Sequence, residues 1–495
     1  METSLSDSSR SYSSGDQIMS CDPLVWLMYS TGYKKRCAYC FQESQELRTC
    51  SGCQLHRYCN SACQAADWKV EHKLECAIMK KIRKGSESRS PDEEDSWSVP
   101  PEITAKLANK IRLNAMMDIP GMGQKSVKDL LLMLPANPAH LDVEQEMHSV
   151  LRAMKSKYSV VAGLPAAEFL PFYEIVRYNI LTIYGSQGMP IGFAVYPPAP
   201  PRRMAPVCWD INVVLHYRGR RLVMHAVEVI PEYTGTENLR YTDTREPFCL
   251  TREARRVRFE ERYGCPCTCH RCTEEYDGEI NSLRCVTVGC TSRIPSDSRA
   301  HGPCSECGAI NSDRLMHFRR FLEDFTFIRE HYTMTFHGKK FTDLCEEVDA
   351  TGILQPDAHF RYICGLQLSR KYFDENRFED GWRATQELID IVRKIHPEYS
   401  AYRARFLMSA GRSSVAALSQ RLSNERKRLS KPAKRALDAL VGQVCHHAIE
   451  YCKEAKNILV KVYGQESKEA QKASAVFEDA IVKLHPIELA FHRKK

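Results

Sequence analysis

Eight residues with zinc-binding side chains lie between Cys37 and Cys76, and they come in four closely spaced pairs. A CxxC pair presents two sulfur atoms to one ion, and two ligands four residues apart on a helical turn present two more. Because four protein ligands leave no open position for a water nucleophile, these pairs predict two structural, tetrahedral zinc sites. Ordinary burial of small apolar residues would not produce this regular spacing. The pairs are Cys37 with Cys40, Cys50 with Cys53, Cys59 with Cys63, and His72 with Cys76.

The length of 495 residues exceeds one ordinary core, so we expect two or three compact units. Hydrophobic residues at 43% and charged residues at 27% are typical of a folded protein. No apolar run reaches the ~20 residues of a membrane span, and the first residues do not resemble a secretory signal. We therefore expect residence in the nucleus or the cytoplasm, where the 22 cysteines stay reduced and clustered ones bind metal.

The basic excess is small, since 70 basic residues face 62 acidic ones and the formal charge is +8. One local cluster of basic residues occurs late in the chain, and a solvated helix face explains it better than a nucleic-acid surface. Nucleic acid is therefore not an expected partner. The cluster contains Arg426, Lys427, Arg428, Lys431, Lys434 and Arg435.

A second cysteine group, in the segment CPCTCHRC, supplies three ligands through Cys267, Cys269 and Cys272. A tetrahedral zinc site needs a fourth ligand. Cys265 is close in sequence, but its sulfur would crowd a CxC pair, so a distant cysteine such as Cys208 is at least as good a candidate. The residues alone leave both alternatives open.

A third cysteine group has the pair, loop and pair form of a small zinc ribbon. Free surface thiols are the alternative interpretation. The group consists of Cys285, Cys290, Cys304 and Cys307.

Apolar periodicity predicts helices over 103–157, short strands over 178–241, and helices again beyond residue 313. In the last part, 382–396 and 448–464 are typical of paired antiparallel helices in a repeat array. Such arrays usually provide a concave wall for protein binding.

The ligand spacing of the first cluster resembles that of a MYND finger, and Tyr58 before Cys59 and Trp68 ahead of His72 agree with this resemblance. The resemblance implies that the first and third ligand pairs share one zinc ion and the second and fourth pairs share the other. It also implies binding of proline-rich peptides or other protein surfaces. The two implied ligand sets are Cys37, Cys40, Cys59 and Cys63, and Cys50, Cys53, His72 and Cys76.

Most of the chain resembles the SMYD family of SET-domain protein lysine methyltransferases, in which a MYND finger is inserted. The similar segments are LPAAEFLPFYEIVRYNILTI, IGFAVYP, INVVLHYRGRRLVMHAVEVI and LTREARRVRFEERYGCPCTCHRC. The implied fold class is α+β, with an irregular β-rich SET-like core, a post-SET zinc cluster and a C-terminal helical-repeat, TPR-like domain. The expected division is a flexible N-terminus at 1–14, a SET-like N-terminal piece at 15–36, the MYND finger at 37–76, a helix and linker at 77–101, a helical SET insert at 102–177, a SET-like β core at 178–244, the post-SET cluster and zinc ribbon at 245–312, and a C-terminal helical domain at 313–495.

The resemblance implies that Cys208 is the fourth post-SET ligand, because it falls on the cysteine of the family's NHSC motif. The other motif residues, which hold S-adenosylmethionine in the family, are replaced by Ala205, Pro206 and Val207. The family's Gly-rich turn is missing before Gly15, and Cys265 occupies the place of its adenine-stacking aromatic residue. Three lost contacts predict weak or no cofactor binding.

Tyr241 falls at the position of the family's catalytic tyrosine, although a tyrosine packed in a strand explains it equally well. Asn212 and Asn179 are candidates for a rebuilt cofactor site. The sequence thus predicts a zinc-binding SET/MYND protein that acts mainly through protein interactions, with weak or no methyltransferase activity. The alternative is an active protein lysine N-methyltransferase with a histone or another protein as substrate.

Overall fold

In a computed structural model the chain forms two compact units. The first unit comprises Met1–Arg245 and Glu253–Cys269, and the second comprises Glu246–Arg252 and His270–Lys495. The structure describes residues 11–29, 32, 35–73, 76–77, 80, 101–117, 141–157, 165–185, 190–197, 203–208, 211–231, 238–242, 252–263, 265–273, 282–295, 303–330, 335–336, 339–356, 358, 360–396, 398–425 and 431–492.

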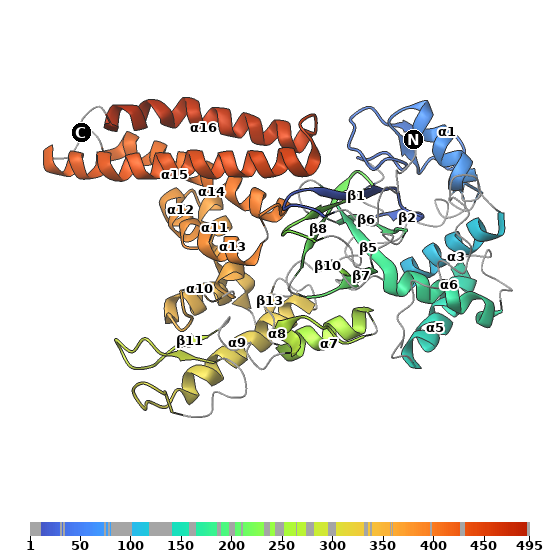
Figure 1. The fold of residues 1–495 in the computed structure, drawn as a ribbon, viewed down its shortest axis with the longest axis horizontal. Helices are drawn as coiled ribbons and strands as arrows, with labels where there is room; N and C mark the ends of the chain where they lie inside the picture. The colour runs from blue at the N-terminus through green and yellow to red at the C-terminus, as the bar shows by residue number, and fades with distance from the viewer. Residues whose placement is uncertain are drawn as a thin grey trace. The chain divides into compact units, whose positions relative to one another are not determined.

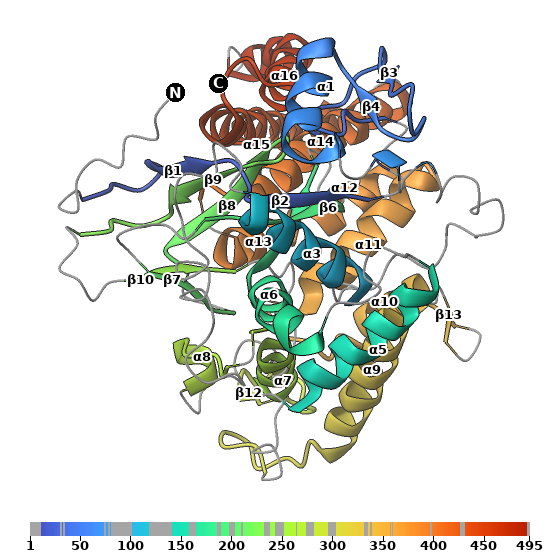
Figure 2. The ribbon, with the colours of Figure 1, turned by 90° about the vertical axis from the view of Figure 1, so that its right-hand side faces the viewer.

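Two three-stranded antiparallel sheets form the centre of the first unit. Each sheet pairs a strand from the start of the chain with strands from beyond residue 179, so the polypeptide must return before either sheet is complete (Figure 2). The first sheet contains β1 (Gln17–Cys21), β9 (Arg221–Ala226) and β8 (Val213–Arg218), and the second contains β2 (Val25–Met28), β6 (Pro190–Val195) and β5 (Ile180–Tyr184), each in that order.

Three helices gather beside the second sheet (Figure 1). They are α3 (Pro101–Met117), α5 (Leu141–Lys157) and α6 (Ala166–Asn179). Successive side chains of a strand point to opposite faces, and in β2 Val25 and Leu27 pack in one core cluster with the helices. Trp26 and Met28 pack in another cluster, which includes side chains of the first sheet. The second sheet is therefore buried on both faces, between helices and sheet.

Short elements complete the first unit. Strands β7 (Arg203–Pro206) and β10 (Asn238–Tyr241) form a parallel pair in which Pro206 is opposite Tyr241. Strands β3 (Arg48–Thr49) and β4 (Arg57–Tyr58) form a small hairpin within the cysteine-rich segment. A helix, α7 (Arg252–Tyr263), leads to the CPCTCHRC segment, in which the chain passes to the second unit with the short helix α8 (His270–Thr273).

The second unit is mainly helical, and its last helices, α15 (Lys431–Tyr463) and α16 (Lys468–His492), run side by side (Figure 1). Two small strand pairs accompany the helices, namely β11 (Leu283–Arg284) with β12 (Arg293–Ile294) and β13 (Thr335–Phe336) with β14 (Lys339–Lys340). The helices are α9 (Ser312–Glu330), α10 (Phe341–Thr351), α11 (Phe360–Asp374), α12 (Phe378–Gln386), α13 (Ile389–Ile395), α14 (Ala401–Glu425), α15 (Lys431–Tyr463) and α16 (Lys468–His492).

The helical segment 382–396 is divided between α12 and α13. The Thr385 hydroxyl donates to the Gly381 carbonyl over 2.7 Å, and such back-bonding by a hydroxyl bends helices. The Leu388 amide then bonds to the Thr385 carbonyl, which tightens the chain between the two helices. Helices of such different lengths follow no common period, so the TPR-like repeat remains a prediction.

A mixed helix and sheet fold is confirmed, whereas the SET-like character of the core and the eight-part division remain predictions. Among the described residues, no helix combines the length and apolar character needed to cross a membrane. Of the basic cluster, Arg426, Lys427 and Arg428 lie outside the described residues, as do the side chains of Lys431, Lys434 and Arg435.

Candidate metal centres

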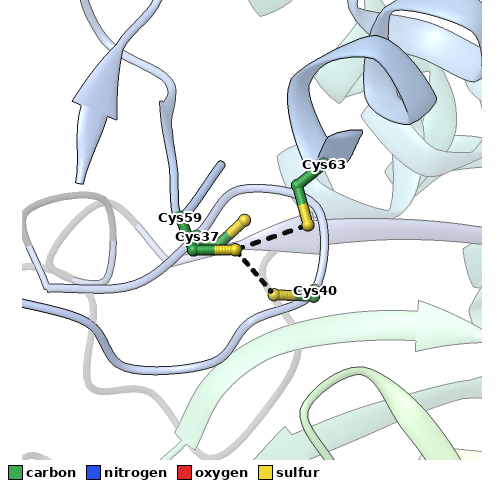
Figure 3. A group of neighbouring side chains, drawn as sticks. All are labelled: Cys37, Cys40, Cys59 and Cys63. Carbon is green, nitrogen blue, oxygen red and sulfur yellow. Dashed lines mark hydrogen bonds between the residues drawn. The ribbon is translucent and has the colours of Figure 1, made fainter. Parts of the chain in front are cut away.

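Four sulfur atoms of the 37–76 segment converge, those of Cys37, Cys40, Cys59 and Cys63 (Figure 3). Zn–S bonds of about 2.3 Å place the sulfurs of a tetrahedral site about 3.8 Å apart. The observed separations are 3.8 Å between Cys40 and Cys59 and 3.4 Å between Cys59 and Cys63. A hydrogen bond from Cys40 lowers the pKa of Cys37 to about 5, so one thiolate is available at neutral pH. These distances and this charge fit a zinc ion.

The position of Cys63 is fixed by the start of helix α1 (Ser61–Asp67). Asn60 caps this helix, because its side-chain oxygen accepts a hydrogen bond from the Cys63 amide over 2.8 Å. Cys59 therefore lies ahead of the helix. The prediction that Cys59 and Cys63 share one helical turn is wrong, although their sulfurs meet as expected.

The second ligand group brings His72 to two cysteines. The Nε2 atom of His72 lies 3.3 Å from the Cys50 sulfur and 3.6 Å from the Cys53 sulfur. The Cys76 sulfur lies 3.9 Å from that of Cys50. Burial opposes ionisation of Cys50, but the backbone amides of Cys53 and Gly52 lower its pKa. The group matches the chemistry of a Cys₃His zinc site.

His72 is presented by a stretch of π-helix, Trp68–His72, that continues α1. Single turns of π-helix often occur at functional sites, where they redirect a side chain. His56 stacks on His72 with ring centres 4.3 Å apart. The Tyr58 hydroxyl donates to the buried carboxylate of Asp67 over 2.6 Å. The roles of His56 and Asp67 were not foreseen, because they follow no metal-ligand spacing.

The finger is packed against the first sheet at the β8–β9 turn. A side chain on Gly219 would lie 2.1 Å from the Cys40 carbonyl, so only glycine allows this approach. The next residue, Arg220, places its guanidinium 3.8 Å from the Trp26 ring centre and 3.9 Å from that of Tyr39. Because Trp26 belongs to β2 and Tyr39 to the finger, Arg220 joins the finger to the core.

The third group consists of Cys208, Cys267, Cys269 and Cys272, whose sulfurs lie within 4.8 Å of one another. The Cys208 and Cys269 sulfurs are 3.4 Å apart, and all four side chains are buried. Cys265 is not part of this group, and burial raises its pKa. Of the two open alternatives for the fourth partner, the structure brings Cys208 to the CxCxxC segment.

The fourth group brings together the predicted ribbon cysteines, Cys285, Cys290, Cys304 and Cys307. A hydrogen bond with Ser292 lowers the pKa of Cys304 to about 6.

The candidate cofactor residues, Asn212 and Asn179, bond to backbone groups, and the candidate catalytic residue, Tyr241, lies in a core cluster. The side-chain oxygen of Asn212 accepts the Arg240 amide over 2.6 Å and so joins its loop to β10. The side-chain amide of Asn179 donates to the Ile175 carbonyl at the end of α6. Tyr241 is only 7% exposed and lies in the core cluster between the sheets.

Comparison with known protein families identifies a MYND finger at residues 37–76, which contains both ligand groups of the finger. Two relatives match over the longer stretches, and both are named histone-lysine N-methyltransferases. ASHR1 of Arabidopsis thaliana is 23% identical over 315 residues, which is 61% of either chain. Human SMYD3 is 23% identical over 273 residues, which is 54% of this chain and 58% of the relative. These matches support an assignment to the SMYD family.

A SET and MYND domain-containing protein of Dictyostelium discoideum is 35% identical to this chain over 81 residues, which is 15% of this chain and 14% of the relative. The matched part of the chain spans about 60% of the length of ASHR1 and of SMYD3. The predicted zinc chemistry thus has two supports, namely the MYND finger and the grouped sulfur atoms.

Proposed function

We propose that this SMYD-family chain is a zinc-stabilised protein that acts mainly through protein–protein interactions and has weak or no methyltransferase activity. One contrast carries the proposal: the cysteines and His72 remain grouped as metal ligands, while the family's cofactor-holding residues are replaced. This pattern is expected when metal-dependent folding is retained and cofactor chemistry is not. With this function we expect residence in the nucleus or the cytoplasm.

The replaced residues have little to offer a cofactor. Alanine and proline side chains donate no hydrogen bond, and they stand at Ala205 and Pro206 in the strand beside Tyr241. Methyl transfer from a sulfonium to a lysine amine depends on alignment and electrostatics. Each lost hydrogen bond costs about 1 kcal/mol or more, and the aromatic contact to adenine is lost as well, so these losses together weaken cofactor affinity by roughly a hundredfold.

A substitute cofactor site would need polar groups that face the ligand. Asn212 already uses its side-chain oxygen on the Arg240 amide, and Asn179 uses its side-chain amide on the Ile175 carbonyl. A cofactor group that took the Asn212 side-chain oxygen would compete with the Arg240 amide for it, and loss of that hydrogen bond would cost free energy. Both observations favour the interaction role.

The finger offers a surface for a partner. Trp68 is 43% exposed and lies edge-on to His72, with ring centres 5.8 Å apart. Exposed aromatic side chains form the walls of grooves that bind proline-rich segments. We therefore propose that proline-rich peptides or other protein surfaces bind at the finger, with the helical tail as a second protein-binding surface.

Methyl transfer from labelled S-adenosylmethionine to protein substrates tests the proposal, with the zinc-loaded full chain and histones among the substrates. We expect no transfer above the background of a heat-denatured sample. Calorimetry with S-adenosylmethionine up to about 1 mM should show no saturable binding. In the same preparation, a proline-rich peptide library should give binding that the Trp68→Ala variant loses.

An active protein lysine N-methyltransferase is the second candidate, favoured by the names of the longer relatives and by Tyr241 on β10. In that case Tyr241 would orient the lysine amine, and Asn212 and Asn179 would contribute to the cofactor site. Labelled methyl transfer that is lost in Tyr241→Phe would establish this candidate and overturn the first.

A further inference from the structure

We propose that the second unit binds a fourth zinc ion through Cys285, Cys290, Cys304 and Cys307, and that this ion holds the segment formed by residues 282–295 and 303–311 in its fold. The site lies outside the MYND finger matched at 37–76 and shares no residue with the Cys208 group. The inference is independent of methyl transfer and of partner binding at the finger.

The sulfur atoms have the spacing that zinc requires. Cys285 and Cys307 are 3.5 Å apart, and Cys290 and Cys304 are 3.7 Å apart. These separations are close to the edge of about 3.8 Å in a tetrahedral site with four Zn–S bonds. The pairs that meet come from opposite ends of the segment, so one ion would join both ends.

The segment has too little apolar material to fold without such a crosslink. Among described residues 282–295 and 303–311, the buried apolar side chains other than cysteine are Leu283 and Ile294. Val288 is 100% exposed and Ile310 is 75% exposed, so the larger aliphatic residues of the loops do not form a core. Strands β11 and β12 have two residues each. Structures of this size and exposure usually depend on a metal for stability.

Two glycines shape the loops that carry the ligands. Gly289 and Gly308 have φ angles of 84° and 71°, in the left-handed region that favours glycine. The Gly308 amide bonds to the Cys304 carbonyl over 2.8 Å, and the Cys290 amide bonds to the Thr287 carbonyl over 3.1 Å. The first turn ends at Cys290 and the second begins at Cys304, so each turn carries a ligand of the group.

The ion would also support the chain after α10. The Arg284 amide bonds to the Ile353 carbonyl over 2.8 Å. The side-chain amide of Gln355 lies 3.4 Å from the carbonyl oxygens of both Leu283 and Ser292. Because these bonds need both ribbon strands in place, loss of zinc should open the turn around Ile353.

Metal analysis of the zinc-loaded full chain tests the site. We expect four zinc ions per chain, one for each sulfur-containing ligand group. The Cys304→Ser and Cys307→Ser double variant should hold one ion fewer. Cys265→Ser is the matched control, because Cys265 belongs to no group, and it should keep all the zinc of the wild type.

A second measurement uses only the wild-type chain, in case the double variant does not fold. Cys307 is exposed, so without zinc it should react readily with a maleimide. With zinc bound we expect alkylation to slow by at least about tenfold, and amide exchange near Ile353 to slow as well. Equal alkylation of Cys307 with and without zinc, or unchanged zinc content in a folded double variant, would overturn the proposal.

Discussion

The guanidinium of Arg220 lies 3.9 Å from the ring centre of Tyr39 and brings a β-turn of the core against the MYND finger. Arg220 is 8% exposed and also lies against Trp26, so its charge is held between two aromatic faces. Cation–π contacts are stronger when desolvated, and this one connects two parts of the first unit. The finger is therefore packed on the sheet and is not a loosely attached module.

Replacing Arg220 with methionine should loosen the finger, because the apolar stem is kept but the cation is lost. We expect the free energy of opening for residues 37–63, measured by hydrogen exchange, to fall by about 1–2 kcal/mol. Arg221→Met is the matched control, because Arg221 is half exposed and pairs with the exposed Asp22. Equal protection in both variants would contradict the role of Arg220.

Replacing Gly52 with alanine should weaken zinc binding in the second finger site. A Cβ atom at this position would lie 2.7 Å from the Cys76 sulfur, so the ligand would have to move. We expect zinc affinity of this site, measured by chelator competition, to fall on the order of tenfold, about 1.4 kcal/mol. Ser51→Ala changes an exposed neighbour and should release zinc as the wild type does.

The Tyr58→Phe variant tests the hydrogen bond to the buried Asp67. The carboxylate would lose a donor at 2.6 Å, and leaving a buried acceptor short of a partner costs about 1–3 kcal/mol. We expect the finger to lose zinc at a lower chelator concentration, although all eight ligands are intact. Tyr39→Phe keeps its ring against Arg220 and should behave as the wild type does. A Tyr58→Phe finger as stable as the wild type would show that the bond contributes nothing.

Glu454 on α15 should make the second unit sensitive to acid. It accepts hydrogen bonds from Arg403 on α14 at 2.6 Å and from Arg393 on α13 at 2.8 Å. Burial acts against ionisation, but these two arginines lower the pKa of Glu454 below its ordinary value of 4.5. A lowered pKa in the folded state means that the stabilisation is complete above the unfolded value and is lost as the pH falls through the folded value.

The Glu454→Gln variant should therefore be less stable than the wild type at neutral pH, by about 1–2 kcal/mol. The difference should begin to shrink as the pH falls through the unfolded value of about 4.5, and it should vanish only below the lowered pKa of the folded carboxylate. Hydrogen exchange in α13, α14 and α15 measures it. Glu450→Gln is the control, since the Glu450 pair with Lys453 is about half exposed. A stability difference between Glu454→Gln and the wild type that grows as the pH falls would contradict the role of Glu454 as an ionised partner of the two arginines.

Pro206 is opposite Tyr241 in the parallel pair of β7 and β10, which allows a restoration test of the cofactor argument. The Ala205→Asn and Pro206→His double variant brings back the polar residues of the family motif. We expect it to bind S-adenosylmethionine at least about tenfold more tightly than the wild type in calorimetry. A wild-type chain that already binds the cofactor tightly, with no gain on restoration, would contradict the proposed loss.

The metal chemistry of the finger could be predicted from the sequence, because zinc dictates both ligand type and spacing. In a reduced protein, a CxxC pair such as Cys50 and Cys53 that lies among further paired ligands is typical of a metal site. The periodic apolar segments likewise predicted helices that became α5 and α15, since a helix that buries one face needs apolar residues every three or four positions.

Other features depended on contacts between distant parts of the chain. The resemblance to the family motif pointed to Cys208, but the CxCxxC segment alone could not decide between Cys208 and Cys265. The meeting of Cys208 with Cys269 depends on folding, because the two residues are 61 positions apart. The cysteine pattern likewise gave no sign that Asp67 and His56 would lie beside His72, because those contacts require the hairpin and helix of the finger to be packed together.

The sequence by itself determined that this protein binds zinc in a MYND finger, because the ligands and their spacing are local and zinc accepts few alternatives. Only the tertiary structure decided how the finger is held, through Gly219 and Arg220, and that the Asn212 side chain is engaged by the backbone of β10. The physical reason is that ligand spacing is a property of a short segment. Burial, close approach and hydrogen-bond partners are properties of surfaces that meet only when the chain has folded.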